Sequence, residues 1–280
     1  MKHCLAAFSE IGEALQKANR ILIASDFDGT LCPIAADPSK VFLTEAVLDT
    51  LRHVRQCERV TLTVISGRHL PDVRRRVPLD LIFAGNHGLE IADPGYCISH
   101  PAATRLRPLI ARSRQRLTGL QRYWPGAWIE DKEFSLTLHY RNVDETRRHA
   151  LVFETRQCLR VFAPLLALRI GIMSLEIRPK VNWDKGSALR YIGETLGPFD
   201  LSICLGDDTT DESMFRANRG QINIRVGPPG RTVAGHCLAD PTEVAIFLSR
   251  IAKECCQEGG SISRAAPPLA GIESLIDCSQ

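Results

Sequence analysis

The stretch ILIASDFDGTL, residues 21–31, decides the fold of this chain. Its first four residues are apolar, which is the pattern of a strand buried on both faces of a parallel sheet. Two carboxylates, Asp26 and Asp28, come directly after Ser25, and Gly29 allows the chain to turn sharply behind them. Ligands of open α/β sheets bind beyond the carboxyl ends of the strands, so this pattern predicts a site at Asp26 and Asp28.

Further apolar runs end in the same way. Val60–Ile65 is followed by Ser66-Gly67-Arg68, and Leu201–Leu205 is followed by Gly206-Asp207-Asp208. Segments with apolar residues at helical spacing lie between the runs, and Lys185 opens one of them. Strands that alternate with helices predict an α/β fold with a Rossmann-like, doubly wound parallel sheet.

The alternation of strands and helices is interrupted between the two halves of this pattern. An arginine-rich helical segment follows residue 101, and Trp128–Asp131 and Phe134–Tyr140 then alternate as consecutive strands. Such strands predict an antiparallel sheet backed by helices. We therefore expect a core formed by residues 1–98 and 182–258, an inserted α/β cap formed by residues 99–181, and a mobile tail at 259–280.

Composition excludes several classes of protein. The chain has 280 residues, of which 44% are hydrophobic and 24% charged, and its net charge of +3 is too small to indicate a nucleic-acid partner. No apolar run approaches the roughly 20 residues that span a bilayer, so we expect no membrane partner and a cytoplasmic protein. The ten cysteines show no CxxC spacing, which indicates neither a zinc site nor a disulfide framework. Nothing in the sequence indicates an oligomeric state.

Acidic residues at neighbouring strand ends need a cation. Asp26, Asp28, Asp207 and Asp208 would repel one another unless positive charge neutralised them, and hard oxygen ligands suit Mg²⁺. Lys185 and the start of its helix supply positive charge for a phosphate. Each aspartate alone could equally be a turn residue or a helix cap. Four such positions in order along the chain favour a site.

The order of these motifs resembles that of the haloacid dehalogenase superfamily of phosphohydrolases. The motifs are DFDGTL (26–31), SGR (66–68), KG (185–186) and GDDTTDE (206–212). The resemblance implies that Asp26 is the nucleophile, that Asp28 is the general acid and base, and that Ser66 and Lys185 hold the phosphoryl group. It also implies an Mg²⁺ ion bound by the Asp26 carboxylate, the Asp28 backbone carbonyl and Asp207, with Asp208 or Asp211 in support.

Narrower features resemble one branch, the trehalose-phosphate phosphatases. These are AGNHGLE (84–90), the GDDTTDE form of the last motif, and EDK (130–132), HYR (139–141) and LEIRP (175–179) in the cap. The resemblance implies that the substrate is trehalose 6-phosphate. The residues then expected to line the substrate site, besides Asp26 and Asp28, are Phe27, Gly67, Arg68, Asn86, His87, Glu130, Lys132, Arg141 and Glu176.

The cap residues suit a sugar because charged side chains bind hydroxyls well. Strand alternation puts Glu176 and Arg178 on one face, and Ser135, His139 and Arg141 on one face. The alternative is an ordinary solvated sheet surface. Three other functions stay open: another sugar phosphatase such as one acting on sucrose phosphate, a phosphosugar mutase, and a sugar-phosphate sensor that binds without catalysis.

Overall fold

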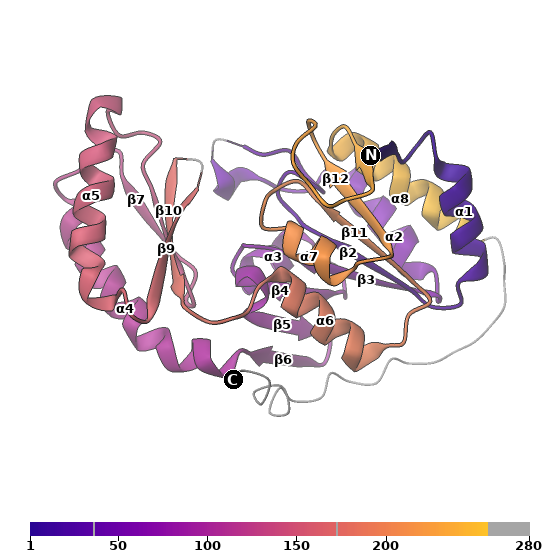
Figure 1. The fold of residues 1–280 in the computed structure, drawn as a ribbon, viewed down its shortest axis with the longest axis horizontal. Coiled ribbons are helices and arrows are strands. Elements are labelled where there is room, and N and C mark those ends of the chain that lie inside the picture. Colours follow the sequence, from indigo (N-terminus) through magenta and orange to yellow (C-terminus); the bar gives the residue numbers. More distant parts are fainter. Residues whose placement is uncertain (36, 172, 257–280) are drawn as a thin grey trace. The chain divides into compact units, whose positions relative to one another are not determined.

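The computed structural model describes residues 1–35, 37–171 and 173–256, and the chain divides into two compact units (Figure 1). The first unit contains residues 1–98 and the chain from Trp183 onwards, and the second contains Ser99–Asn182. The tail expected at 259–280 lies outside the described residues. No helix in the described ranges is both long and apolar enough to cross a bilayer.

A nine-stranded sheet forms the centre of the first unit, in the order β1-β13-β12-β11-β2-β3-β4-β5-β6. From β1 to β4 every neighbouring pair is parallel, and this confirms the predicted doubly wound sheet. The strands are β1 (Lys2–His3), β2 (Ile21–Ser25), β3 (Val60–Ile65), β4 (Ile82–Gly85), β5 (Glu90–Asp93), β6 (Tyr96–Ser99), β11 (Leu201–Gly206), β12 (Ile222–Val226) and β13 (His236–Leu238).

Helices cover both faces of this sheet because the strands are apolar on both. Ile21 and Ile23 of β2 pack with the helices of one face, whereas Leu22 and Ala24 pack with those of the other. The first group is α1 (Phe8–Lys17), α2 (Glu45–Gln56), α3 (Leu70–Arg76) and α8 (Pro241–Cys256), and the second is α6 (Lys185–Leu196) and α7 (Glu212–Ala217). The cores between sheet and helices fix the strand ends that carry the predicted motifs.

The sheet edge beyond β4 is an addition that the sequence pattern did not predict. After a short 3₁₀ turn, η2 (Asn86–Gly88), the chain returns as β5, which pairs antiparallel with β4. Asp93 Oδ1 accepts a hydrogen bond from the Gly95 backbone N–H at 3.0 Å, and this bond closes the turn before β6. The β4–β5 return places the segment AGNHGLE against the end of the parallel sheet.

The second unit contains the antiparallel sheet that the sequence predicts. Its strands, β7 (Trp128–Asp131), β8 (Leu136–His139), β10 (Ser174–Pro179) and β9 (Leu166–Gly171), lie in that order. The long helix α4 (Pro101–Gln121) and α5 (Arg148–Leu159) bury one face of the sheet through two apolar clusters. Short 3₁₀ turns are η1 (Pro38–Lys40), η3 (Glu145–Arg147) and η4 (Arg160–Phe162).

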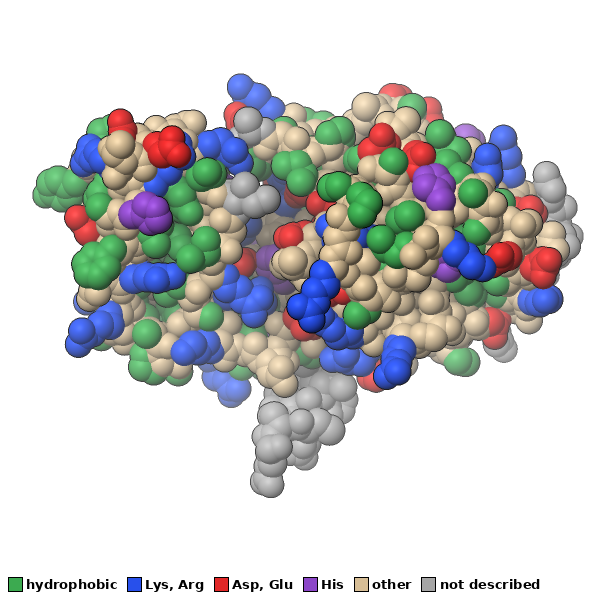
Figure 2. Space-filling view, turned by 45° about the horizontal axis from the view of Figure 1, so that its top comes forward, with side chains coloured by type: hydrophobic (Ala, Val, Ile, Leu, Met, Phe, Trp, Pro, Cys, Tyr) green, Lys and Arg blue, Asp and Glu red, His purple; other side chains and the backbone are tan. Residues whose placement is uncertain are grey.

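The arginines of α4 lie on the solvent-exposed surface of the helix. Arg107 pairs with Glu133, and Arg114 Nη1 lies 2.5 Å from Asp131 Oδ2, with both arginines exposed. Basic and acidic side chains are interspersed over the face in Figure 2.

The cysteines differ from expectation at one position. Cys204 is fully buried in β11, as its apolar surroundings predict, and it is one of seven described cysteines with a free thiol. Cys57, in contrast, is disulfide-bonded. Cysteine spacing along the sequence gave no indication of that bond.

Candidate active site

Two neighbouring parallel strands bring Asp26 and Asp207 together. β2 and β11 are in register, with Ser25 opposite Leu205, and the Asp26 backbone N–H donates to the Leu205 carbonyl at 3.0 Å. Asp26 and Asp207 therefore leave the same edge of the sheet. Asp211, at the start of α7, completes a group in which one carboxylate oxygen from each of the three aspartates lies within 4.8 Å of the others.

Two glycines leave the room that these carboxylates occupy. Gly29 has a φ of 77°, and a Cβ there would lie 2.1 Å from Asp207 Oδ2. A Cβ on Gly206 would lie 2.4 Å from the Asp211 side chain. Larger residues at either position would displace a carboxylate from the cluster, so the motif glycines are steric requirements of the acidic site.

Lys185 is the cation inside the cluster. Its Nζ lies 2.8 Å from Asp26 Oδ1 and 2.7 Å from Asp211 Oδ1, and its side chain is only 2% exposed. Asp184 caps α6 by accepting from the Ser187 backbone N–H at 2.9 Å, which sets Lys185 as the first helical residue. One lysine among three aspartates leaves the site short of positive charge.

The ionisation of the cluster reflects that shortage. Burial raises the pKa of Asp26 well above its usual value, and the charges of Asp211 and Asp207 raise it further against the opposing effect of Lys185. Burial and then Asp211 raise the pKa of Asp207 to about 7. Burial disfavours the charged form of Lys185, but Asp211 and Asp26 outweigh it and its pKa rises. Asp26 and Asp207 are thus difficult to ionise side by side. Because carboxylate oxygens are hard ligands, the pair is suited to a divalent cation.

The structure distinguishes between the two supporting acids. Asp211 is fully buried in the cluster, where its Oδ2 also accepts from the Asp208 backbone N–H at 2.9 Å. The Asp208 carboxylate is exposed and instead accepts from the Thr209 backbone N–H at 2.6 Å. Asp211, rather than Asp208, therefore joins Asp26 and Asp207.

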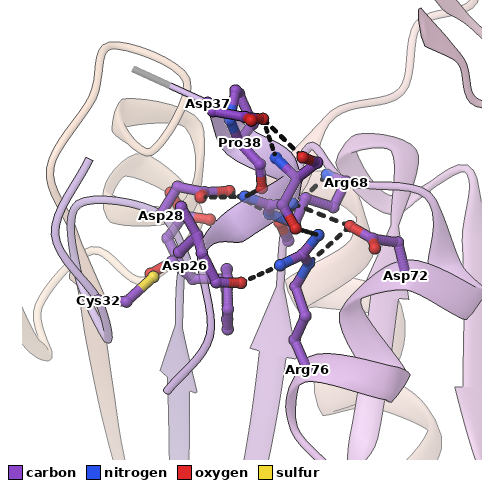
Figure 3. A network of polar contacts seen from close by, with 12 residues as sticks. Asp26, Asp28, Cys32, Asp37, Pro38, Arg68, Asp72 and Arg76 are labelled. Carbon is purple, nitrogen blue, oxygen red and sulfur yellow. Dashed lines mark hydrogen bonds and ion pairs between the residues drawn. The ribbon is translucent and has the colours of Figure 1, made fainter. Parts of the chain in front are cut away.

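Asp28 lies two residues beyond Asp26 but has a different partner. Both of its carboxylate oxygens accept hydrogen bonds from Arg68, at 2.7 Å from Nε and 2.6 Å from Nη2 (Figure 3). The Asp28 side chain is 38% exposed, whereas that of Arg68 is 7% exposed. Phe27 is completely buried beneath the guanidinium, so contact with substrate is not available to its side chain.

The loops after β3 and β4 brace each other. Ser66 is 1% exposed, and its Oγ accepts from the Arg68 backbone N–H at 3.1 Å. A Cβ on Gly67 would lie 2.7 Å from the His87 ring, so the imidazole needs this glycine. Asn86 is 1% exposed, and its Nδ2 donates to Glu90 Oε2 at 2.5 Å. These contacts make Asn86 part of the framework rather than an exposed surface for the substrate.

In the second unit, cross-strand register gathers most of the predicted sugar-binding residues on one face. Glu130 lies opposite Thr137, which lies opposite Glu176. Glu130 Oε2 is 3.8 Å from Lys132 Nζ. Arg141 is exposed and lies beyond the end of β8, outside this row. Its contact with substrate stays a prediction.

Strand alternation predicts His139 on this face, but its aromatic partner there, Trp128, is not among the residues expected to bind the sugar. Trp128 stacks on His139 with ring centroids 3.9 Å apart, and His139 Nε2 is 2.9 Å from Glu130 Oε2. Alternation along β7 puts Trp128 and Glu130 on the same face, which was the available signal. A flat aromatic surface next to charged groups suits a ring that carries hydroxyls.

Comparisons with known proteins agree with this geometry. The sequence model of the trehalose-phosphatase family matches residues 24–233. The chain is 37% identical over 260 residues to a probable trehalose-phosphate phosphatase 4 of Oryza sativa subsp. japonica, covering 88% of this chain and 70% of the relative. It is 35% identical to trehalose 6-phosphate phosphatase RA3 of Zea mays, covering 86% and 72%.

A solved structure of a related protein has a similar fold. The crystal structure of a trehalose-6-phosphate phosphatase related protein superposes with a TM-score of 0.75 at 27% identity, covering 83% of this chain and 97% of that one. The matched segment contains all four acidic and basic motifs of the active site. The chain therefore belongs to the trehalose-phosphatase family, a haloacid dehalogenase type of phosphoric monoester hydrolase.

Proposed function

We propose that this protein hydrolyses trehalose 6-phosphate to trehalose and phosphate, with Mg²⁺ and through an aspartyl-phosphate intermediate. The observation that carries the proposal is the buried Asp26 carboxylate, held 2.8 Å from Lys185 within the acidic cluster. The relatives' names supply the substrate. An aspartate nucleophile splits one difficult displacement into two easier steps.

In the first step, an Asp26 oxygen attacks phosphorus and the sugar oxygen leaves. Asp28 acts as the general acid and supplies a proton to the leaving oxygen, so that trehalose departs as the neutral alcohol. Lys185 and Ser66 hold the non-bridging phosphoryl oxygens, whose charge they balance as the bond to the sugar breaks.

In the second step, Asp28 accepts a proton from water. The resulting hydroxide attacks phosphorus, the bond to Asp26 breaks, and phosphate is released with the carboxylate restored. The partial exposure of Asp28 admits both a leaving sugar and an incoming water. Because Asp26 is deeply buried, other nucleophiles have little access to the phosphoryl group that it carries.

The acidic cluster would hold the magnesium ion. The Asp26 and Asp207 carboxylates and the Asp28 backbone carbonyl would be ligands, with Asp211 in support. A bound divalent cation would neutralise charge on the phosphoryl group and on the cluster.

Magnesium should stabilise the protein most at alkaline pH. Because the pKa of Asp207 is about 7 in the folded protein and ordinarily near 4, this carboxyl favours the folded state at low pH. That contribution is lost as the pH rises from about 4 to about 7, where the Asp207 carboxyl ionises in the folded protein. Mg²⁺ at about 100 times its Kd should add about 2.7 kcal/mol at pH 8, or roughly 5–10 °C in Tm.

Melting curves with Mg²⁺ or a chelator at pH 6 and pH 8 measure this effect. The magnesium-dependent rise should be larger at pH 8, and it should disappear in Asp207→Asn. An equal rise at both pH values, or the same rise in that variant, would place magnesium elsewhere.

Sugar recognition should depend on the polar face of the second unit. A hydrogen bond to a charged group contributes roughly 1.5–3 kcal/mol, so Glu176→Ala should lower kcat/KM for trehalose 6-phosphate about ten- to a hundred-fold. Hydrolysis of a small aryl phosphate, which has no sugar to bind, should hardly change. Glu145→Ala, at an exposed acid of the same unit, is the matched control. Equal losses on both esters would refute a role in reading the sugar.

A panel of phosphate esters tests the choice of substrate. Phosphate release should be fastest by far from trehalose 6-phosphate, and glucose 6-phosphate, which lacks the second ring, should be a poor substrate. Preference for sucrose 6-phosphate would assign the protein to another sugar. Formation of an isomeric sugar phosphate would indicate a mutase.

A further inference from the structure

Arg68 makes a two-point contact with the proposed acid and base. Its Nε and Nη2 each donate to a different oxygen of Asp28, at 2.7 and 2.6 Å. Paired bonds from a planar guanidinium fix both the position and the plane of a carboxylate. A single bond from a lysine would leave the carboxylate free to rotate.

Arg68 is itself held on every side. Its Nη1 donates to Asp72 Oδ2 at 2.9 Å, its Nη2 donates to the Pro38 carbonyl at 3.0 Å, and its guanidinium carbon lies 5.3 Å from the centre of the Phe27 ring. Each of its three nitrogens thus has a protein acceptor. The sequence predicts that Arg68 contacts substrate, but its hydrogen-bond donors are directed at protein groups.

A second arginine extends this support to the loop after β2. Arg76 is 2% exposed in its side chain, and its Nε donates to the same Asp72 oxygen at 2.8 Å. Its other nitrogens donate to the carbonyls of Ser39, at 3.1 Å, and Val41. Asp72 therefore links two buried arginines, and Figure 3 shows this chain of contacts running from Asp28 to Arg76.

We propose that Arg68 is a positioning residue that holds the Asp28 carboxylate in its working orientation, with Asp72 and Arg76 holding Arg68. The inference rests on the proposed function, because it requires Asp28 to transfer the proton. A general acid must lie within hydrogen-bond reach of the leaving oxygen, and a displacement of about 1 Å can cost about a hundred-fold in rate. Arg68 keeps its own protons at all working pH values, so it cannot replace Asp28 as the acid.

The test is a double-mutant cycle measured with trehalose 6-phosphate. Arg68→Lys keeps the positive charge but removes the paired hydrogen bonds to Asp28. The kcat should fall about ten- to a hundred-fold while KM changes little. Asp28→Asn should lower kcat by about 10²–10⁴-fold. In the Asp28→Asn background, Arg68→Lys should have almost no further effect on kcat.

Arg75→Lys is the matched control. Arg75 lies on α3 beside Arg76 and donates to the other oxygen of Asp72 at 3.0 Å, but its side chain is 68% exposed. Its replacement should leave kcat and KM unchanged. If Arg68→Lys does not fold, as judged by its melting curve, Asp72→Asn takes its place in the cycle with the same expected pattern.

The two possible failures are distinguishable. Losses that multiply in the double variant, or a raised KM with normal kcat in Arg68→Lys, would mean that Arg68 contacts substrate directly and would overturn the inference. A folded Asp28→Asn protein with normal kcat would instead overturn the proposed role of Asp28.

Discussion

Asp26→Asn should lower kcat for trehalose 6-phosphate by at least about 10⁴-fold while the protein stays folded. The amide has the shape of the carboxylate but not its nucleophilic charge, so no covalent intermediate can form. Removing one charge from the cluster also relieves repulsion by Asp207 and Asp211, which now raises the pKa of Asp26. The melting temperature should therefore not fall sharply.

Phosphate release and Tm, measured on the same preparation, check this result. Asp80→Asn is the matched control, since Asp80 is an exposed partner of Arg55 and its replacement should leave kcat unchanged. Mass spectrometry should verify that the asparagine has not deamidated to aspartate. Appreciable turnover by intact Asp26→Asn would show that Asp26 is not the nucleophile.

Lys185→Met should damage both stability and activity. The change leaves Asp26 and Asp211 buried without their cation, and breaking a buried ion pair costs about 3–5 kcal/mol. That cost corresponds to a fall in Tm of roughly 6–20 °C. Turnover should also collapse, because the phosphoryl oxygens lose their buried positive partner.

The stability deficit of Lys185→Met should shrink as the pH falls. Without the lysine the pKa of Asp26 is raised still further, so protonation at low pH removes the uncompensated charge. Melting curves of the variant between pH 5 and pH 8 measure this trend, with Lys17→Met, at a 79% exposed lysine, as the control. A deficit that stayed constant with pH would argue against charge compensation as the function of Lys185.

The acidic edge of the sheet can be predicted from sequence because local pattern fixes it. β2 and β11 are short apolar runs that are buried on both faces, and carboxylates follow each of them directly. The turn at Gly29 is also predictable, since a glycine directly after the acidic residues of a strand end permits the positive φ of 77° that the structure shows. Strand identity and strand ends therefore follow from the chain itself.

Partner choice around Arg68 cannot be predicted in this way. Asp28 and Arg68 lie 40 residues apart, and their pairing depends on how the loop carrying Pro38 returns over α3. Whether Asp208 or Asp211 turns inward depends on the exact start of α7. These are properties of three-dimensional packing, and composition or periodicity does not encode them locally.

The most direct test of the proposed activity is to incubate the purified protein with trehalose 6-phosphate and Mg²⁺ and to quantify both products. We expect equal amounts of trehalose and inorganic phosphate, with both abolished by a chelator and restored by Mg²⁺. Tight binding of trehalose 6-phosphate without release of phosphate would contradict it and would make the protein a sensor built on a phosphatase fold.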